Sequence, residues 1–301
     1  MIIGVVPRER FAATAAVLQR LFEVTAPPFR LIVVDCAMPR CYREAVDRVL
    51  MGHANVEIIH HDEYLRPNQS RNLVVRASKG SDWICLMDND VFVKPEWLPK
   101  LVRACEEEEA DVATPLIIEG DETGPIHFDE RLGCIRRKAP WISGRWIIKK
   151  PSFDYKGDRL ASRRRQDVVE DHCLLYRSET LARISPFDES LNTRELVDLS
   201  MRLHTVGARV IFEPSARVVF VPPPPIEPEE REFYSFRWEL NRAVYSNQYV
   251  ERKWRISGLP NSLNFIQERL SFLNADGPTS SAKAEEESSG NRPSRQMQDV
   301  S

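Results

Sequence analysis

The 301-residue chain lacks several features that would assign it to a specialised class of protein. Its six cysteines are scattered, with no C-x-x-C pair and no histidine at zinc-finger spacing. This pattern argues against a disulfide scaffold or a structural zinc site and suits a reducing cytosol. No apolar run reaches the ~18 residues of a membrane-spanning helix, and the apolar start is too short for a signal peptide. We therefore expect a soluble cytoplasmic protein, with peripheral membrane contact left open.

The chain also lacks a strong excess of charge of either sign. Its net charge is −3 and its pI is near 6.1, which predicts no general attraction to nucleic acid or to an anionic membrane. The cluster from Arg163 to Arg165 is a local exception. It suits either a solvated loop or a contact with a phosphate-bearing acceptor or lipid headgroup.

About the first 120 residues alternate short apolar runs with helical patterns, as expected of repeated βα units. Strands are predicted at 2–6, 31–35, 56–59, 83–88 and 111–118, with helices between them. Units of this length predict an α/β fold with a doubly wound, mostly parallel, Rossmann-like sheet.

The second half is less regular. Residues 120–165 suggest hairpins or loops that cover a site, and further strands are predicted at 173–176, 210–212 and 218–221. A helix is predicted at 194–206, and a long helical stretch at 228–254 follows the stiff proline run 222–225. From residue 274 on, the composition predicts a disordered tail.

The triplet Asp88-Asn89-Asp90 is the most informative feature of the sequence. It closes an apolar run, and buried strands do not normally end in two carboxylates, because each is costly to desolvate unless it is paired or binds a metal. At the exposed end of a strand in an open α/β sheet, such a pair can hold a hard divalent cation, and the cation can hold a diphosphate. The alternative is an ordinary acidic turn.

Two further polar positions fit the same edge of the predicted sheet. Asp35 ends the second strand, where it can contact a nucleotide base or ribose or can serve as a helix cap. Arg71, followed by Asn72, lies near a helix start and is placed either to contact phosphate or to be a solvated surface residue.

The helix predicted at 194–206 places two carboxylates at its start. Leu196, Leu199 and Leu203 recur at a helical spacing and should face the core. Glu195 and Asp198 share another face, from which a carboxylate could take a proton from an acceptor hydroxyl. Acids also favour a helix N-terminus for electrostatic reasons alone. We prefer the role of base for Glu195 and a supporting role for Asp198.

In their joint order and spacing, these motifs resemble family 2 glycosyltransferases with the GT-A fold. The resemblance covers roughly residues 1–221 and includes the segments 173–177 and 186–189. The stretch 233–238 also resembles the helical extension of one branch of that family. The resemblance implies a glycosyltransferase domain at 1–221, with a nucleotide-binding half at about 1–118 and an acceptor half at about 119–221. A proline-rich segment and helical extension at 222–273 and the tail at 274–301 would follow.

The resemblance also implies a hexosyltransferase-type reaction, in which a sugar passes from a nucleotide-diphosphate donor to an acceptor hydroxyl with inversion at the anomeric carbon. Asp90, helped by Asp88, would hold Mn²⁺ or Mg²⁺ on the diphosphate through this DxD motif. Glu195 would deprotonate the acceptor, which could be a carbohydrate, a lipid-linked compound or another hydroxyl compound. Donor-binding residues would then be the set Asp35, Arg71, Asn72, Asp88 and Asn89.

The chain departs from the family pattern at two positions. Many members carry Glu-Asp at the base position, whereas here Leu196 follows Glu195 and cannot move protons. Many also place a metal-binding histidine after the last strand, where this chain reads Val219-Phe220-Val221-Pro222. His172 is a candidate replacement ligand, with a buried structural histidine as the alternative. On the acceptor side, Trp146, Trp238 and Asp198 are weaker candidates.

Two other functions compete with this interpretation. Leu196 and the missing histidine fit a catalytically inactive homologue that binds sugar nucleotides and acts as a partner protein. A nucleotidyltransferase would share the fold and the metal, but it normally has a glycine-rich phosphate loop, and residues 4–10 contain one glycine.

Overall fold

The computed structural model describes residues 1–127, 134–138, 144–149, 162–223, 225–257, 259 and 263–274. The tail predicted at 274–301 lies outside these residues except for Asn274, as do parts of the segment 120–165. Among the described residues, no helix combines the length and the apolar character needed to cross a membrane.

The first half of the chain consists of the predicted βα units. The apolar runs form strands, which are buried except for the half-buried strand at 56–61, and the amphipathic stretches form helices. In chain order the elements are β1 (Ile2–Val6), α1 (Thr14–Val24), β2 (Arg30–Cys36), α2 (Arg40–Leu50), β3 (Val56–His61), α3 (Pro67–Ala77), β4 (Trp83–Asp88), β5 (Val91–Val93), α4 (Trp97–Glu107) and β6 (Val112–Glu119).

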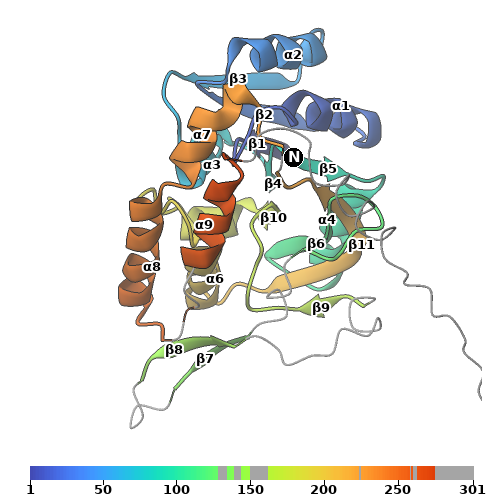
Figure 1. The fold of residues 1–301 in the computed structure, drawn as a ribbon. Helices are drawn as coiled ribbons and strands as arrows, with labels where there is room; N and C mark the ends of the chain where they lie inside the picture. The colour runs from blue at the N-terminus through green and yellow to red at the C-terminus, as the bar shows by residue number, and fades with distance from the viewer. Residues whose placement is uncertain are drawn as a thin grey trace, which may run out of the picture.

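The sheet is mixed and mostly parallel, in the order β3-β2-β1-β4-β10-β6-β11-β5 (Figure 1). The antiparallel members are β10 (Cys173–Arg177), which lies between β4 and β6, and the short strands β5 and β9 (Arg164–Arg165), which both pair with β11 (Val210–Phe220). Strand order reverses between β1 and β4. Right-handed crossovers therefore place α1 and α2 on one face and α3 on the other. In open α/β sheets, ligands bind at the carboxyl ends of the strands where the strand order reverses.

The two short strands predicted near the end of the sheet are one continuous strand, β11, so that prediction was wrong. Its pairing with β6 shifts register between Glu213 and Arg217. Pro214 lies in that interval and cannot donate a ladder hydrogen bond, which is why a bulge is tolerated there.

The single helix predicted at 228–254 is three pieces: a 3₁₀ turn at Pro228–Glu230, α7 (Arg231–Arg237) and α8 (Leu240–Trp254). The break comes at Trp238. The Glu239 side chain accepts hydrogen bonds from the backbone N–H groups of Asn241 and Arg242 and so caps a new helix.

Further elements complete the second half, some of them without a sequence prediction. The predicted helix at 194–206 is α6 (Glu195–Thr205), which packs against α8. The helices α5 (Ser178–Ile184) and α9 (Leu263–Ser271) were not predicted, and α9 packs against α8. A hairpin of β7 (Cys134–Arg137) and β8 (Trp146–Lys149) lies beyond α6 and α8, away from the main sheet (Figure 1).

At Gly4, a side chain of helix α3 packs directly on the backbone of β1. A Cβ atom at this position would overlap Cγ1 of Val74 and would lie 3.2 Å from Cδ2 of Leu86. Both neighbours are buried, and Val74 is fixed on α3. The helix can therefore rest on β1 only because residue 4 has no side chain.

We expect Gly4→Ala to lower the free energy of unfolding by about 1–3 kcal/mol, because the added methyl group overpacks the core. Urea unfolding followed by circular dichroism measures this change. Val74→Ala removes the side chain that the added methyl group would overlap. In the double variant, the loss of unfolding free energy should be smaller than the sum of the two single-variant losses by about 0.5–3 kcal/mol. Unchanged stability in Gly4→Ala, or strict additivity, would contradict the packing described.

Candidate functional site

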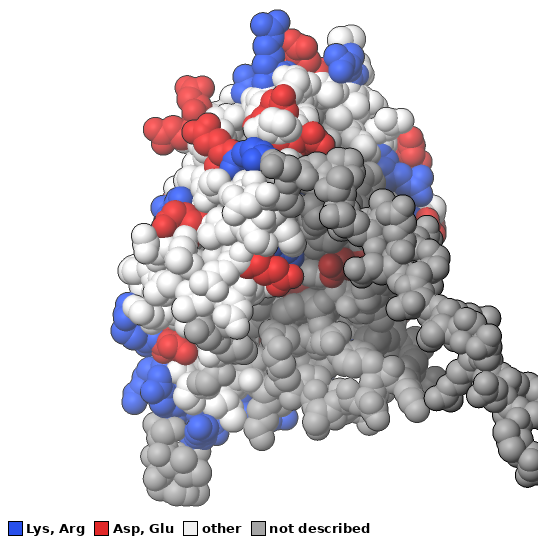
Figure 2. Space-filling view, viewed as in Figure 1, with Lys and Arg blue, Asp and Glu red and all other residues white. Residues whose placement is uncertain are grey.

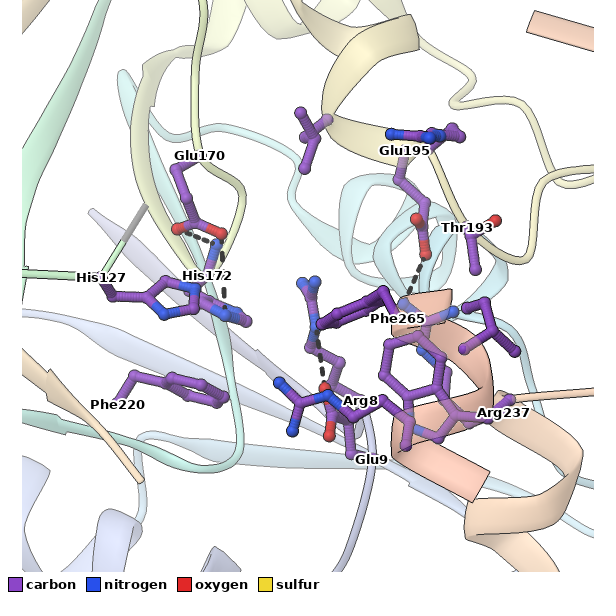
Figure 3. A pocket seen from close by; sticks show the side chains of 15 residues that line it. Arg8, Glu9, His127, Glu170, His172, Thr193, Glu195, Phe220, Arg237 and Phe265 are labelled. Atoms are coloured by element: carbon purple, nitrogen blue, oxygen red, sulfur yellow. Dashed lines mark hydrogen bonds and ion pairs between the residues drawn. The ribbon is translucent and has the colours of Figure 1, made fainter. Parts of the chain in front are cut away.

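The crevice at the carboxyl edge of the sheet contains a cavity of about 270 Å³. Figure 3 shows Glu170, His172 and His127 on one side, Glu195 and Arg237 on the other, and Arg8 with Glu9 between them. Figure 2 shows acidic side chains exposed in a hollow on this side of the molecule. The lining residues come from distant parts of the chain and are Arg8, Glu9, His127, Glu170, His172, Thr193, Arg194, Glu195, Leu196, Phe220, Arg237, Trp238, Phe265, Ile266 and Arg269.

A buried network of four charged residues lies behind this cavity. Arg8 Nη1 is 2.9 Å from Asp88 Oδ2 and 3.0 Å from Asp171 Oδ1. Arg71 Nη2 is 3.1 Å from Asp88 Oδ1, and its Nη1 is 2.7 Å from Asp171 Oδ2. Each carboxylate thus contacts both guanidinium groups. The network joins the end of β1, helix α3, the end of β4 and the segment before β10.

This network determines how the two carboxyls titrate. Burial by itself raises the pKa of Asp88, but Arg8, Arg71 and His172 outweigh it, and the net pKa lies below the ordinary value. Asp171 behaves in the same way: burial raises its pKa, and the two arginines bring it well below the usual range. Both carboxyls are therefore ionised at neutral pH.

Asp90 differs from Asp88 although it lies only two residues away. Its side chain is fully buried, and neither carboxylate oxygen has a hydrogen-bond partner within the described structure. Burial, followed by the nearby charges of Asp88 and Glu9, raises its pKa well above the ordinary value. Buried polar atoms are normally satisfied, so an unsatisfied carboxylate at a ligand-binding edge indicates a missing cationic partner.

His172 links the acidic triplet to the cavity. Its Nδ1 is 2.7 Å from Asp88 Oδ2, and its Nε2 is 3.7 Å from Glu170 Oε1. Burial, and then the charge of Arg8, lowers its pKa to about 3, so the ring is neutral at physiological pH. The ring stacks on Phe220, with ring centroids 4.2 Å apart.

Glu195 lies at the first position of α6 and faces the same cavity. Its Oε1 is 3.1 Å from Nη2 of Arg237, an ion pair whose geometry is not that of a hydrogen bond, and Oε1 makes no hydrogen bond among the described residues. Arg194, just before it, has a left-handed backbone conformation (φ 67°), which begins the helix abruptly at the cavity wall. Leu196 was expected to face the core; it is half-buried, packs against the cluster that includes Leu191 and Val197, and also lines the cavity.

Asp198 is buried and makes contacts within the protein. Its Oδ2 accepts a hydrogen bond from Arg202 Nε at 2.7 Å, and its Oδ1 accepts one from Trp254 Nε1 at 2.7 Å. Lys253 Nζ lies 2.6 Å from the same Oδ1. Asp198 therefore ties α6 to α8.

Asp35, Asn72 and Asn89, also predicted to bind the donor, are not among the residues that line the cavity. Asp35 ends β2 and is held by the backbone N–H of Met38 (2.8 Å) and by Arg43 Nε (2.7 Å). Asn72 bonds the backbone N–H and C=O of Phe187. Asn89 accepts a hydrogen bond from the backbone N–H of Arg8.

The two tryptophans proposed for the acceptor side lie apart from each other. Trp238 lines the cavity and is buried, and no hydrogen bond from its Nε1 is found within the described residues. Trp146 lies on the β7–β8 hairpin, where its ring meets the edge of His204. It is not among the residues that line the cavity.

Several site residues escaped the sequence analysis. Arg8 could have been found, because it is the first charged residue after β1 and neighbouring parallel strands end together. Asp171, His127 and Arg237 gave no local signal, since only the folded chain brings them to this edge. Asp171 pairs with Arg8 and Arg71, and Arg237 pairs with Glu195, all at distant positions in the chain.

The residues at this edge fit a divalent metal ion. Asp90 offers two buried oxygens that lack a partner in the described part of the chain. His127, Glu170 and His172 offer ligand atoms that all lie within 4.8 Å of one another. Asp88 is less available, because its oxygens already contact Arg8, Arg71 and His172, one of which would have to move.

A sequence model described as glycosyl transferase family 2 matches residues 7–178, more than half of the chain. The chain belongs to this family. The match includes the acidic triplet, Arg8, Arg71 and the segment before β10, and it ends before Glu195.

A curated relative is the pre-mycofactocin glycosyltransferase of Mycobacterium tuberculosis, which is 29% identical to this family 2 member over 196 residues. The alignment covers 63% of this chain and 37% of the relative. The chain therefore spans little more than a third of the length of the curated relative it matches.

Solved structures of low sequence identity share the GT-A glycosyltransferase fold. GalNAc-T7 with UDP, GalNAc and Mn²⁺ has a TM-score of 0.56 at 16% identity, covering 91% of this chain and 54% of that one. Staphylococcus aureus TarS with UDP-GlcNAc has a TM-score of 0.55 at 15% identity, covering 91% and 71%. The mannosyltransferase PcManGT from Pyrobaculum calidifontis, with GDP-Man and Mn²⁺, has a TM-score of 0.55 at 14% identity, covering 97% and 76%.

In metal-free protein, replacement by asparagine should change the stability of the fold in opposite directions at Asp88 and Asp90. Asp90 has a raised pKa in the folded state, so its ionised form destabilises the fold once pH exceeds the ordinary range near 4. Asp90→Asn should therefore stabilise the protein by about 1–3 kcal/mol at neutral pH, because an unsatisfied charge is removed. Asp88→Asn should destabilise it by about 3–5 kcal/mol, because two buried arginines lose a partner.

Urea unfolding with a chelator present, at about pH 7.5 and about pH 5, measures both effects. The stabilisation produced by Asp90→Asn should be smaller at the lower pH, because more of the wild-type Asp90 is protonated there and fewer molecules carry a buried charge. Destabilisation of Asp90→Asn at both pH values would show that its carboxylate has a partner and would contradict the site described.

Proposed function

We propose that this family 2 member transfers a sugar from a nucleotide-diphosphate donor to a hydroxyl group, with inversion and with the help of a divalent ion. One observation carries the proposal: Glu195 and Arg8 line the same cavity, and Arg8 is bonded to Asp88 at the end of β4. A carboxylate able to accept a proton thus faces the edge where an anionic donor would bind.

Glu195 suits the role of base in a single in-line displacement. It would take the proton from the acceptor hydroxyl while the oxygen attacks the anomeric carbon from the side opposite the leaving group. The bond from that carbon to the diphosphate oxygen breaks in the same step, which inverts the configuration. Its position at the abrupt start of α6 holds the carboxylate at the cavity wall.

Arg237 suits recognition of the diphosphate leaving group. Its guanidinium is buried at the cavity, and Nε and Nη1 have no hydrogen-bond partner in the described structure. A phosphate oxygen would satisfy these donors, since guanidinium groups pair well with phosphate. A bound Mn²⁺ or Mg²⁺, with Asp90 among its ligands, would offset negative charge on the departing group.

The proposed class of donor is supported by the fold and by the polar residues at the carboxyl edge of the sheet. UDP-GlcNAc and GDP-Man are ligands of the similar structures, and a nucleotide sugar is accordingly proposed here. Asp35, Arg71, Asn72 and Asn89 stay candidates for donor contacts. Their present hydrogen bonds favour a role for Asn72 and Asn89 in shaping the site rather than in contacting the donor.

The C-terminal helices take part in the proposed site. Trp238 and Phe265 form part of the cavity wall, so the extension at 222–273 would complete the domain at 1–221 rather than stand apart from it. A sugar ring of the acceptor could stack on these aromatic faces. The acceptor remains open between a carbohydrate, a lipid-linked compound and another hydroxyl compound, and the cytoplasmic location stays a prediction.

A catalytically inactive sugar-nucleotide-binding protein is the second candidate. Leu196 favours it, because this apolar side chain lines the cavity beside Glu195, at the position where many family members have an aspartate. Donor binding without turnover would then be the whole activity.

Glu195→Gln should lower the rate of transfer by about 10²–10⁴-fold while leaving donor binding within a few-fold, because only the proton acceptor is lost. Transfer is measured as nucleotide diphosphate released against panels of nucleotide sugars and acceptors. Glu179→Gln is the matched control, since Glu179 is an exposed glutamate in the first turn of α5. Absence of transfer by wild type, with donor binding intact, would favour the inactive homologue.

One nucleoside diphosphate should stabilise the protein against heat only when Mn²⁺ or Mg²⁺ is present. At a ligand concentration of about 100 times Kd, the expected gain is about 2.7 kcal/mol. Asp90→Asn should lose this metal-dependent part. Equal stabilisation with and without metal would contradict the metal-assisted reaction, and a lack of response to any nucleotide would contradict donor binding.

A further inference from the structure

Three potential metal ligands meet on the side of the cavity opposite Glu195. His127 follows β6, whereas Glu170 and His172 precede β10, and the three side chains converge (Figure 3). Their ligand atoms all lie within 4.8 Å of one another. Atoms bonded to one tetrahedral ion at 2.0–2.2 Å lie about 3.4 Å apart, so the three side chains would have to move together by up to about 1.4 Å on binding.

A carboxylate lies behind each imidazole. Nδ1 of His172 is 2.7 Å from Asp88 Oδ2, and Nδ1 of His127 is 2.8 Å from Glu119 Oε2. With the proton on Nδ1, each ring donates to its carboxylate and presents the lone pair of Nε2. This carboxylate–histidine arrangement is the usual support of metal-bound histidines, because it fixes both the tautomer and the ring orientation.

Phe220 restricts the two rings further. It stacks on His172 and lies at a tilt against His127, with ring centroids 4.2 Å and 4.8 Å apart respectively. The two imidazoles are 4.9 Å apart, centroid to centroid. Rings held in this way are pre-positioned for a ligand, so binding an ion would require little reordering.

We propose that His127, Glu170 and His172 bind a divalent transition-metal ion such as Zn²⁺, Co²⁺ or Mn²⁺. Two imidazole nitrogens and one carboxylate oxygen suit these ions better than Mg²⁺ or Ca²⁺, which prefer oxygen ligands. Three protein ligands leave a further coordination position for an oxygen ligand. The set differs from the acidic triplet, in which Asp88 would be the partner that orients His172 rather than a ligand itself.

The site is tested with metal ions alone, without nucleotide or acceptor, so its outcome is independent of sugar transfer. Full-length protein is stripped with a chelator and titrated with Co²⁺, Zn²⁺ and Mg²⁺ by calorimetry and, for Co²⁺, by visible absorption. We expect one equivalent of Co²⁺ or Zn²⁺ to bind and Mg²⁺ to bind much more weakly. Absence of Co²⁺ and Zn²⁺ binding by the wild type would overturn the proposal.

His127→Gln and Glu170→Gln should each weaken Co²⁺ binding by more than about 100-fold, and Glu119→Gln by about 10–100-fold. His53→Gln is the matched control, because His53 is an exposed histidine stacked on Phe22. Asp90→Asn should retain binding of metal alone. Loss of binding in Asp90→Asn but not in His127→Gln would assign the ion to the triplet and refute the proposal.

A measurement on the wild type avoids any dependence on variant folding. Electron spin-echo spectroscopy of the bound Mn²⁺ should reveal coupling to imidazole nitrogen. A spectrum with no nitrogen coupling would overturn the proposed ligand set even if an ion is bound.

Discussion

The paired charges of Arg8, Arg71, Asp88 and Asp171 are the constraint on which the rest of the site depends. All four side chains are buried, and a buried charge is tolerable only when its partner is held in good geometry. Because the four residues come from β1, α3, β4 and the segment before β10, satisfying them fixes the relative positions of those segments. The stability of the fold and the shape of its ligand-binding edge are therefore determined by the same contacts.

This constraint separates the tasks of two neighbouring acids. Asp88 is occupied by both arginines and by His172, and so belongs to the framework. Asp90 has none of these contacts, and the cost of its burial is offset only when a cationic partner is present. The sequence presents the two residues as an equivalent pair. Only their surroundings in the folded chain distinguish the paired Asp88 from the unpaired Asp90, the proposed metal ligand.

The features that the sequence predicted correctly depend on local residue patterns. Alternating strands and helices, the acidic triplet at the end of β4 and the start of α6 at Glu195 all follow from periodicity and end signals. The site features that the sequence did not predict depend on contacts between residues far apart in the chain. The partners of Asp88 come from opposite ends of the domain, and no spacing in the chain indicates that His127 meets His172. The break at Trp238 was missed for another reason: the helical pattern continues through it, although the Glu239 side chain caps the start of a new helix, α8.

The reversed direction of β10 has a consequence for how such a protein can diverge. Strand β6 ends, and β10 begins, at the same edge of the sheet, and each is paired in the sheet on both sides. The chain between Glu119 and Cys173 thus leaves and returns beside the cavity, while its two ends stay anchored. Insertions or deletions between these two anchored ends would leave the paired strands and the charged network beside them in place. The length of this connection can therefore diverge while the framework of the sheet is kept.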